Sequence, residues 1–105
     1  MNKYHLIGIK GTGMSALAIC LKQLGNIVCG SDVEEDFFTV AGLNKENIQI
    51  KVFDENNITD ECIYIISSAY DRSNIEVNKV FSKNYEYYYY HDFMKQYFTG
   101  NIIGV

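Results

Sequence analysis

The sequence has no proline, only three cysteines, no excess of basic residues and no long apolar run. No stretch approaches the ~18 apolar residues of a membrane-spanning helix, so no membrane span is expected. The net charge of −4 argues against nucleic acid or an acidic membrane surface as the main partner. The cysteines have no C-x-x-C spacing, so neither a metal site nor a disulfide framework is predicted. The absence of proline supports no functional conclusion.

The length of 105 residues leaves room for one domain with one core. A hydrophobic fraction of 48% and a charged fraction of 21% are ordinary for a globular protein, and disorder is not expected. Strand-like residues follow directly after position 3, which leaves no room for a signal peptide. A cytoplasmic location is therefore expected.

A strand, a glycine loop and a helix are predicted to follow one another between Tyr4 and Leu24. A short apolar run leads into the loop, and helical spacing of apolar residues begins at Met14. The loop glycines are Gly8, Gly11 and Gly13. Where such a loop opens a helix, unpaired N–H groups and the positive end of the helix dipole meet at one spot. This arrangement predicts an anion site, most often for phosphate, although a tight turn alone uses the same residues.

The glycine spacing departs from the dinucleotide-binding fingerprint G-x-G-x-x-G. Lys10 occupies the place of the middle glycine, which normally lets a pyrophosphate approach the backbone, so the ligand is expected to lie at a different angle. Asp32 follows Gly13 by roughly 20 residues, the distance at which an acid after the second strand accepts hydrogen bonds from ribose hydroxyls. It can instead cap the next helix. An acid at this place disfavours a 2′-phosphate, and therefore an NADP-type ligand.

Short apolar segments alternate with helical patterns along the rest of the chain. Strands are predicted at 26–30, 48–53, 62–66 and 85–90, and helices at 37–43, 74–82 and 91–98. The acidic residues at 34–36 are expected to form a hydrated helix start, and Phe37 is expected to face inward. Together these segments predict a Rossmann-like open parallel sheet of about five strands, in the order 3-2-1-4-5, with helices on both faces. Residues 100–105 have the pattern of a further strand.

Ser67, Ser68 and Ala69 come directly after the apolar segment 62–66. In a sheet of the predicted order this strand lies beside the first strand, across the point where the winding reverses. The hydroxyl and amide groups at 67–69 are then expected to face the glycine loop and to contact a ligand. Two serines after a strand also form ordinary turns.

Five tyrosines between Tyr85 and Tyr90 suggest either a base-stacking surface or a strand. The β-propensity of tyrosine and the acidic charge balance favour the strand. The two histidines, His5 and His91, belong to no metal-ligand spacing. Each is predicted to be a strand-edge or cap residue, not a catalyst.

The segment HLIGIKGTGMSALA, from His5 to Ala18, resembles the opening motif H-x-x-G-I-G-G-x-G-M-S-x-L-A of the Mur ligases. These enzymes build the peptide stem of the bacterial cell-wall precursor. The Met14-Ser15 pair is the more specific part, because generic dinucleotide binders do not require it, whereas Lys10 replaces a family glycine. The segment from Ser67 resembles the family's S-S-A-I followed by N-P-E, with Ile75 in place of the proline. The likeness is greatest to the alanine-adding members.

The resemblance implies that residues 1–99 bind UDP-N-acetylmuramic acid and that residues 100–105 lead into a central ATP-binding domain, followed by a C-terminal domain. In the whole enzyme, ATP and Mg²⁺ would activate the lactyl carboxylate, and an amine would attack the acyl phosphate. The present part would bind without catalysing, and it would need no cofactor or metal of its own. The implied contacts come from Gly8, Lys10, Gly11, Thr12, Gly13, Met14, Ser15, Asp32, Asp54, Ser67, Ser68 and Ala69.

Asp54 stands where the alanine-adding members tend to carry a histidine that helps to hold the uracil. The resemblance implies that its carboxylate accepts a hydrogen bond from the uracil N3–H instead. Two alternatives stay open. One is the ligase that recycles a ready-made tripeptide onto the same nucleotide sugar. The other is a regulatory NAD-binding module, such as the NAD-sensing domain of a potassium-uptake system, against which Lys10 and Met14-Ser15 argue.

Overall fold

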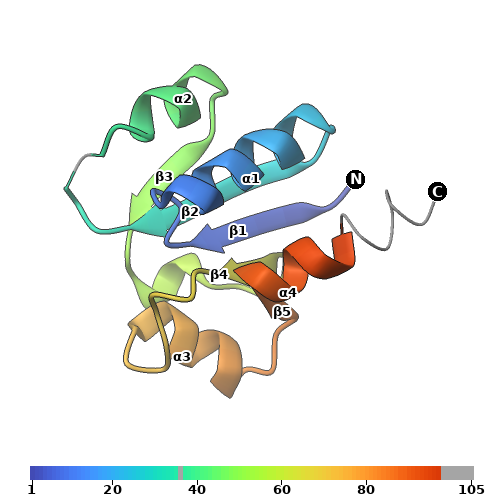
Figure 1. Cartoon of the computed structure of the whole chain (residues 1–105). Coiled ribbons are helices and arrows are strands. Elements are labelled where there is room, and N and C mark those ends of the chain that lie inside the picture. The colour runs from blue at the N-terminus through green and yellow to red at the C-terminus, as the bar shows by residue number, and fades with distance from the viewer. Residues whose placement is uncertain (36, 98–105) are drawn as a thin grey trace.

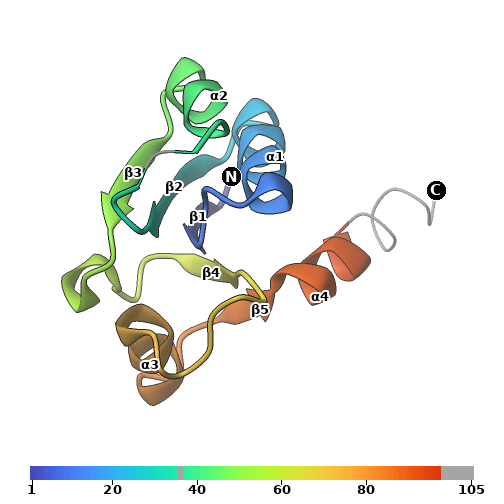
Figure 2. The same cartoon turned by 60° about the vertical axis from the view of Figure 1, so that its left-hand side comes forward.

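Five parallel strands form the central sheet in the order β3-β2-β1-β4-β5, and helices lie against both of its faces (Figures 1 and 2). The structure is a computed structural model, and it describes residues 1–35 and 37–97. The strands are β1 (Lys3–Ile7), β2 (Ile27–Asp32), β3 (Gln49–Val52), β4 (Ile63–Ile66) and β5 (Tyr87–Tyr89). Each neighbouring pair is parallel, which confirms the predicted open sheet of order 3-2-1-4-5.

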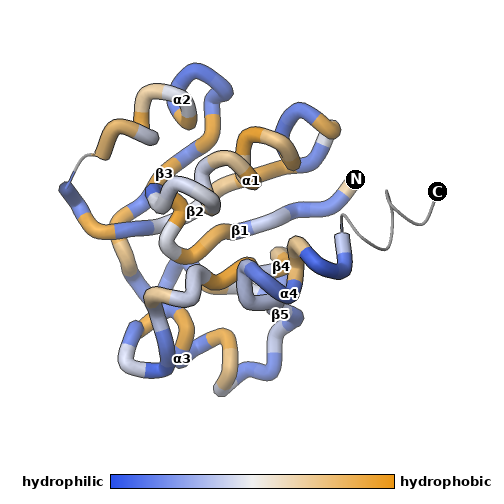
Figure 3. Tube along the Cα trace, viewed as in Figure 1, coloured by the Kyte–Doolittle hydropathy of each residue, from blue (hydrophilic) through white to orange (hydrophobic). Residues whose placement is uncertain are grey.

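Two apolar cores lie on opposite faces of the sheet, because successive residues of a strand point to opposite sides. The helices are α1 (Thr12–Gln23), α2 (Val40–Lys45), α3 (Ile75–Ser82) and α4 (Tyr90–Met94), with a 3-10 turn η1 (Glu55–Asn57) after β3. On one face Leu6 packs in a cluster with residues of α1, α2 and α4, and on the other Ile7 packs with Val77 and Val80 of α3. Figure 3 shows the apolar stretches of α1 and β4 in orange and the hydrophilic turn after α2 in blue. The prediction of helices on both faces is confirmed.

The first helix begins at Thr12, two residues before the predicted start, and ends before Gly25. Gly25 has a φ of +96° and donates to Lys22 O, as expected of a glycine that follows a helix. Asn74 caps α3, because its side chain accepts hydrogen bonds from the N–H groups of Glu76 and Val77. Among the described residues no helix is long and apolar enough to cross a membrane. The predicted strand at 100–105 lies outside the described residues.

The predicted helix at 37–43 is wrong in its position. The helix α2 begins only at Val40, and the side chains of Phe37 and Phe38 are 47% and 82% exposed instead of facing inward. No helix begins at Glu34 and Glu35 either. The physical reason is that backbone carbonyls in this segment accept hydrogen bonds from a distant lysine, described below, so they do not enter a helix.

The prediction that His5 is a strand-edge or cap residue is also wrong. It lies in the middle of β1, the central strand, and only 1% of it is exposed. Its ring nitrogens lie within hydrogen-bonding distance of Ser31, Glu76 and Cys29. His91, by contrast, lies exposed in the first turn of α4, close to the cap position predicted for it.

Candidate functional site

The amino end of α1 presents backbone N–H groups for which no acceptor is recorded among residues 1–35 and 37–97. The first intrahelical hydrogen bond runs from Ser15 N to Gly11 O at 2.8 Å. The N-cap residue Gly11 offers no side chain, and the first turn contains no acidic residue. The N–H groups of Thr12, Gly13 and Met14 are therefore left, together with the positive end of the helix dipole, for an anion from outside.

The amides earlier in the loop are already used to hold the loop against β2. Gly8 N and Ile9 N both donate to Ser31 O, at 2.9 and 3.1 Å. Lys10 N donates to the Asp32 carboxylate at 2.9 Å, and Gly11 N donates back to Gly8 O at 3.2 Å. The candidate anion site therefore includes fewer backbone donors than the glycine pattern suggested, because the N–H groups of Gly8 and Lys10 are used within the loop and those of the first turn of α1 are left.

Two hollows of about 260 and 250 Å³ adjoin this amino end. Gly11, Thr12 and Ser67 line both hollows, which places the first turn of α1 between them. The first hollow is also lined by Gly8, Lys10, Asp32, Val33, Phe37, Phe38, Ala69 and Tyr70. The second is also lined by Gly13, Met14, Ser68, Tyr90 and His91. The structure therefore brings the glycine loop, Asp32 and the segment 67–69 together at the carboxyl edge of the sheet.

Asp32 is the last residue of β2; the residue is 5% exposed and lines the first hollow. It accepts hydrogen bonds from the N–H groups of Lys10 and Val33 and from the Tyr70 hydroxyl at 3.2 Å. A carboxylate has about four acceptor positions, so one remains for a ligand hydroxyl. Burial, followed by the charge of Asp32, raises the pKa of Tyr70, which keeps its hydroxyl protonated as the donor.

Tyr70 is a wall residue that the sequence did not identify. Its ring packs edge-on against Phe53 with centroids 5.1 Å apart, next to the turn that carries Asp54. The only available signal was its position directly after the Ser-Ser-Ala segment. Phe37, Tyr90 and His91 were likewise not predicted as lining residues, because their patterns indicated core, strand and cap positions.

Lys10 is 7% exposed, and its ammonium lies against the segment after β2. The Nζ atom donates to Val33 O at 2.8 Å and to Glu35 O at 2.7 Å, with a longer contact of 3.4 Å to Glu34 O. The Lys10 carbonyl in turn accepts from the Thr39 hydroxyl at 2.6 Å. Lys10 therefore ties the loop that carries Phe37 and Phe38 to the glycine loop, and the predicted charge contact with a diphosphate stays a prediction.

We expect the substitution Lys10→Met to loosen the 33–39 loop without unfolding the sheet. Methionine fills similar space but leaves the three carbonyls without their donor, at a cost of about 1–3 kcal/mol in the free energy of unfolding. The readout is the urea midpoint, together with hydrogen exchange of the Val40 amide, which donates to Phe37 O. Lys45→Met, at an exposed lysine of α2, is the matched control. An equal change in both variants would contradict the role given to Lys10.

The side chains of three further predicted residues form hydrogen bonds within the chain. Ser15 is buried, and its hydroxyl donates to Thr12 O at 3.0 Å within α1. Ser67 Oγ accepts from Ala69 N at 3.2 Å, so it also orders its own turn. Asp54 lines neither hollow, and its carboxylate caps η1 by accepting from Asn56 N at 2.8 Å.

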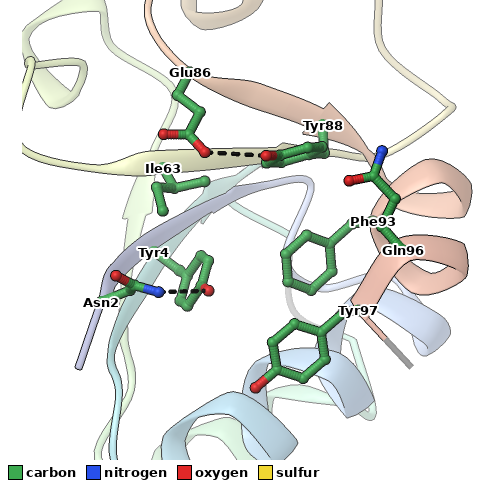
Figure 4. A pocket seen from close by; sticks show the side chains of 8 residues that line it. All are labelled: Asn2, Tyr4, Ile63, Glu86, Tyr88, Phe93, Gln96 and Tyr97. Carbon is green, nitrogen blue, oxygen red and sulfur yellow. Dashed lines mark hydrogen bonds between the residues drawn. The ribbon is translucent and has the colours of Figure 1, made fainter. Parts of the chain in front are cut away.

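A separate hollow of about 430 Å³ lies at the opposite, amino edge of the sheet (Figure 4). Its wall includes Tyr4 of β1, Ile63 at the start of β4 and Tyr88 of β5, with Phe93 from α4. None of the predicted binding residues lines it. No group of three or more His, Cys, Asp or Glu side chains suited to a metal ion occurs in the described part of the chain.

The fold and the site define an α/β domain of the Rossmann-like class, with a candidate anion site at the switch point between β1 and β4. The model of the Mur ligase family, catalytic domain, matches residues 3–100. The chain belongs to the Mur ligase family, and it corresponds to the N-terminal domain.

Curated relatives agree with this assignment. The chain is 46% identical over 98 residues to the UDP-N-acetylmuramate–L-alanine ligase of Streptococcus suis, a match that covers 92% of this chain and 22% of the relative. The enzyme of the same name from Streptococcus thermophilus is 46% identical over 92 residues, covering 87% of this chain and 21% of the relative. The chain thus spans about a fifth of the length of these relatives.

Solved structures agree as well. The UDP-N-acetylmuramate–alanine ligase of Thermotoga maritima superimposes with a TM-score of 0.83 at 28% identity, covering 92% of this chain and 23% of that one. The UDP-N-acetylmuramate:L-alanyl-γ-D-glutamyl-meso-diaminopimelate ligase of Neisseria meningitides gives a TM-score of 0.78 at 25% identity, covering 99% and 32%.

Proposed function

We propose that this chain is the nucleotide-sugar-binding domain of a UDP-N-acetylmuramate–L-alanine ligase, and that it binds UDP-N-acetylmuramic acid. The main support for the proposal is the first turn of α1. The N–H groups of Thr12, Gly13 and Met14 there have no acceptor among the described residues and can bind an anion beside the Asp32 carboxylate. The 46% identity to ligases of that name supports the choice of ligand.

In this proposal the diphosphate lies at the amino end of α1, where the helix dipole and three amides stabilise its charge. The uridine extends into the first hollow, where the remaining acceptor position of Asp32 binds the ribose and the rings of Phe37 and Tyr70 form the walls. The amino sugar extends towards the second hollow, past Ser67 and Ser68. Asp54 lies outside the first hollow, in the turn beside it, and would accept a hydrogen bond from the uracil N3–H if the base extends to that turn.

The residues of this chain bind and orient, and none of them carries out the chemistry. The complete ligase would use ATP and Mg²⁺, held by the central domain, to convert the lactyl carboxylate into an acyl phosphate. The amine of L-alanine would then attack that carbonyl and release phosphate. The central and C-terminal domains are proposed partners within the same polypeptide, and the cytoplasm is the proposed location.

The tripeptide-recycling ligase remains the second candidate, because a ligase of that kind shares the fold with a TM-score of 0.78. The two candidates use the same nucleotide sugar, so this domain does not separate them. A regulatory NAD-binding role is disfavoured because Lys10 replaces the glycine at which a dinucleotide approaches, and its backbone N–H is bound to Asp32.

A calorimetric titration of the 105-residue chain tests the proposal. We expect micromolar binding of UDP-N-acetylmuramic acid and no binding of NADH at the same concentrations. UMP and free N-acetylmuramic acid serve as controls, and each is expected to bind much more weakly because it lacks the diphosphate. Binding of NADH without binding of the UDP-sugar would refute the ligase assignment.

A further inference from the structure

Glu76 is a fully buried acid in the first turn of α3, on the face of the sheet opposite α1. Its Oε1 atom accepts from the Ser31 hydroxyl at 2.5 Å and lies 3.2 Å from His5 Nε2. Its Oε2 atom accepts from Asp54 N at 3.0 Å and from Asn57 Nδ2 at 2.8 Å. One carboxylate therefore joins β1, β2 and the turn after β3; these five residues are called the Glu76 network below.

Two residues of the Glu76 network, Ser31 and Asp54, connect it to the candidate site. Ser31, held through its hydroxyl, uses its own carbonyl to accept from the Gly8 and Ile9 N–H groups that begin the glycine loop. Asp54, held through its backbone, begins the η1 turn beside Phe53, which packs under the wall residue Tyr70. Glu76 touches no part of either hollow.

We propose that Glu76, together with His5, is a positioning residue for nucleotide-sugar binding. By holding Ser31 on one side and Asp54 on the other, it sets the separation between the glycine loop and the turn that borders the uridine hollow. This inference rests on the proposed function. The inference assigns a role to two buried polar residues, His5 and Glu76, that line neither hollow.

The hydrogen bonds of the network also explain how the carboxylate of Glu76 can be fully buried. Burial acts most strongly and raises the pKa of Glu76, but the hydrogen bonds from His5, Ser31, Asn57 and Asp54 outweigh it, so the pKa lies below its usual value. Its contribution to stability is therefore complete at neutral pH and is lost only when the pH falls through that lowered value.

The groups that face His5 are Cys29 and Ser31 from β2, Tyr64 from β4 and Glu76 from α3. The Cys29 sulfur lies 3.4 Å from Nδ1, and the Tyr64 ring centroid lies 5.5 Å from that of His5. Because a carboxylate only accepts, Glu76 is compatible with both the neutral and the protonated imidazole.

Glu76→Gln keeps the shape of the side chain and can keep the network of hydrogen bonds. The Asp54 N–H and the Asn57 amide are fixed donors, so the glutamine oxygen must face them and its NH₂ group must face Ser31 and His5. The serine hydroxyl can rotate and an imidazole nitrogen can accept, so the network remains satisfied. Glu76→Leu, by contrast, leaves the Asp54 and Asn57 donors without an acceptor.

The test measures the affinity of Glu76→Gln and of Glu76→Leu for UDP-N-acetylmuramic acid at neutral pH. We expect Glu76→Leu, which leaves the Asp54 and Asn57 donors unpaired, to lose at least about tenfold in affinity, and Glu76→Gln to stay within about threefold of the parent. Glu61→Gln, which neutralises an exposed acid, should behave like the parent.

An unchanged affinity of folded Glu76→Leu would overturn the inference, since a purely structural glutamate would alter melting alone. If Glu76→Leu does not fold, hydrogen exchange of the parent chain decides. Slow exchange of the Asp54 amide supports the network, and exchange as fast as in an open turn refutes it. If the unsubstituted chain does not bind the nucleotide sugar, the proposed function fails, separately from these outcomes.

Discussion

Replacement of Thr12 by glutamate is expected to abolish binding of the nucleotide sugar while leaving the fold intact. Thr12 is exposed, begins α1 and lies between the two hollows. A carboxylate there would bind to the open amides itself and repel the diphosphate, at about 4 kcal/mol for charges about 4 Å apart near a protein surface. We expect at least about a 100-fold loss of affinity, equivalent to about 2.7 kcal/mol.

The same substitution should stabilise the folded chain, and this opposite sign makes the test specific. The first turn of α1 has no acidic residue, and a negative charge there interacts favourably with the helix dipole by about 0.3–1 kcal/mol. In the Thr12→Gln variant the side chain has the size of glutamate without its charge, so the variant should lose less than about tenfold in affinity. Calorimetry and thermal melting of both variants give the two quantities. Equal affinities for the glutamate and glutamine variants would place the diphosphate elsewhere.

The second large effect is expected for Gly8→Ala, which should destabilise the chain by about 3 kcal/mol. Gly8 has a φ of +91°, a conformation that side chains rarely adopt, and this alone costs about 1 kcal/mol. A Cβ atom would also lie 2.7 Å from Ser67 Cβ and 2.9 Å from the Tyr70 ring, and overpacking of this kind costs about 2 kcal/mol. Both neighbours line the first hollow, so binding should weaken as well.

Gly25→Ala is the matched control because it isolates the backbone contribution. Gly25 has a similar φ of +96°, but no atom lies within 4 Å of the position that a Cβ would take. It should lose only about 1 kcal/mol, with unchanged affinity. Urea denaturation measures both free energies of unfolding. If the two variants lose equal stability, the contacts of Gly8 with Ser67 and Tyr70 do not constrain the loop.

Several parts of the fold were predictable because their causes are local. The strand, glycine loop and helix at the start of the chain follow from residues close together in sequence, and so does the Asn74 cap of α3. The position of Asp32 was predicted because one βα unit has a nearly constant length. The near-continuous apolar run of β4 indicated burial on both faces, and Tyr64, Ile65 and Ile66 are fully buried.

The errors arose where distant residues decide. Phe37 was expected in a helix because it lies at helical spacing from later apolar residues, but Lys10 holds the carbonyls just before it. His5 was expected at an edge although the predicted strand order itself makes β1 central. The partners of its ring, Cys29, Ser31 and Glu76, come from other elements and carry no sequence signal that links them to it.

The sequence by itself determined the order of strands and helices and the resemblance to the Mur ligases, and it predicted the place of the candidate anion site, since each depends on short motifs and on periodicity. Only the tertiary structure decided which loop amides remain open, where the Lys10 ammonium lies and how Glu76 links β2 to the turn at Asp54. The physical reason is that hydrogen-bond donors and acceptors are assigned by proximity in space. A motif specifies which groups are present, and the packed sheet decides which of them are already used.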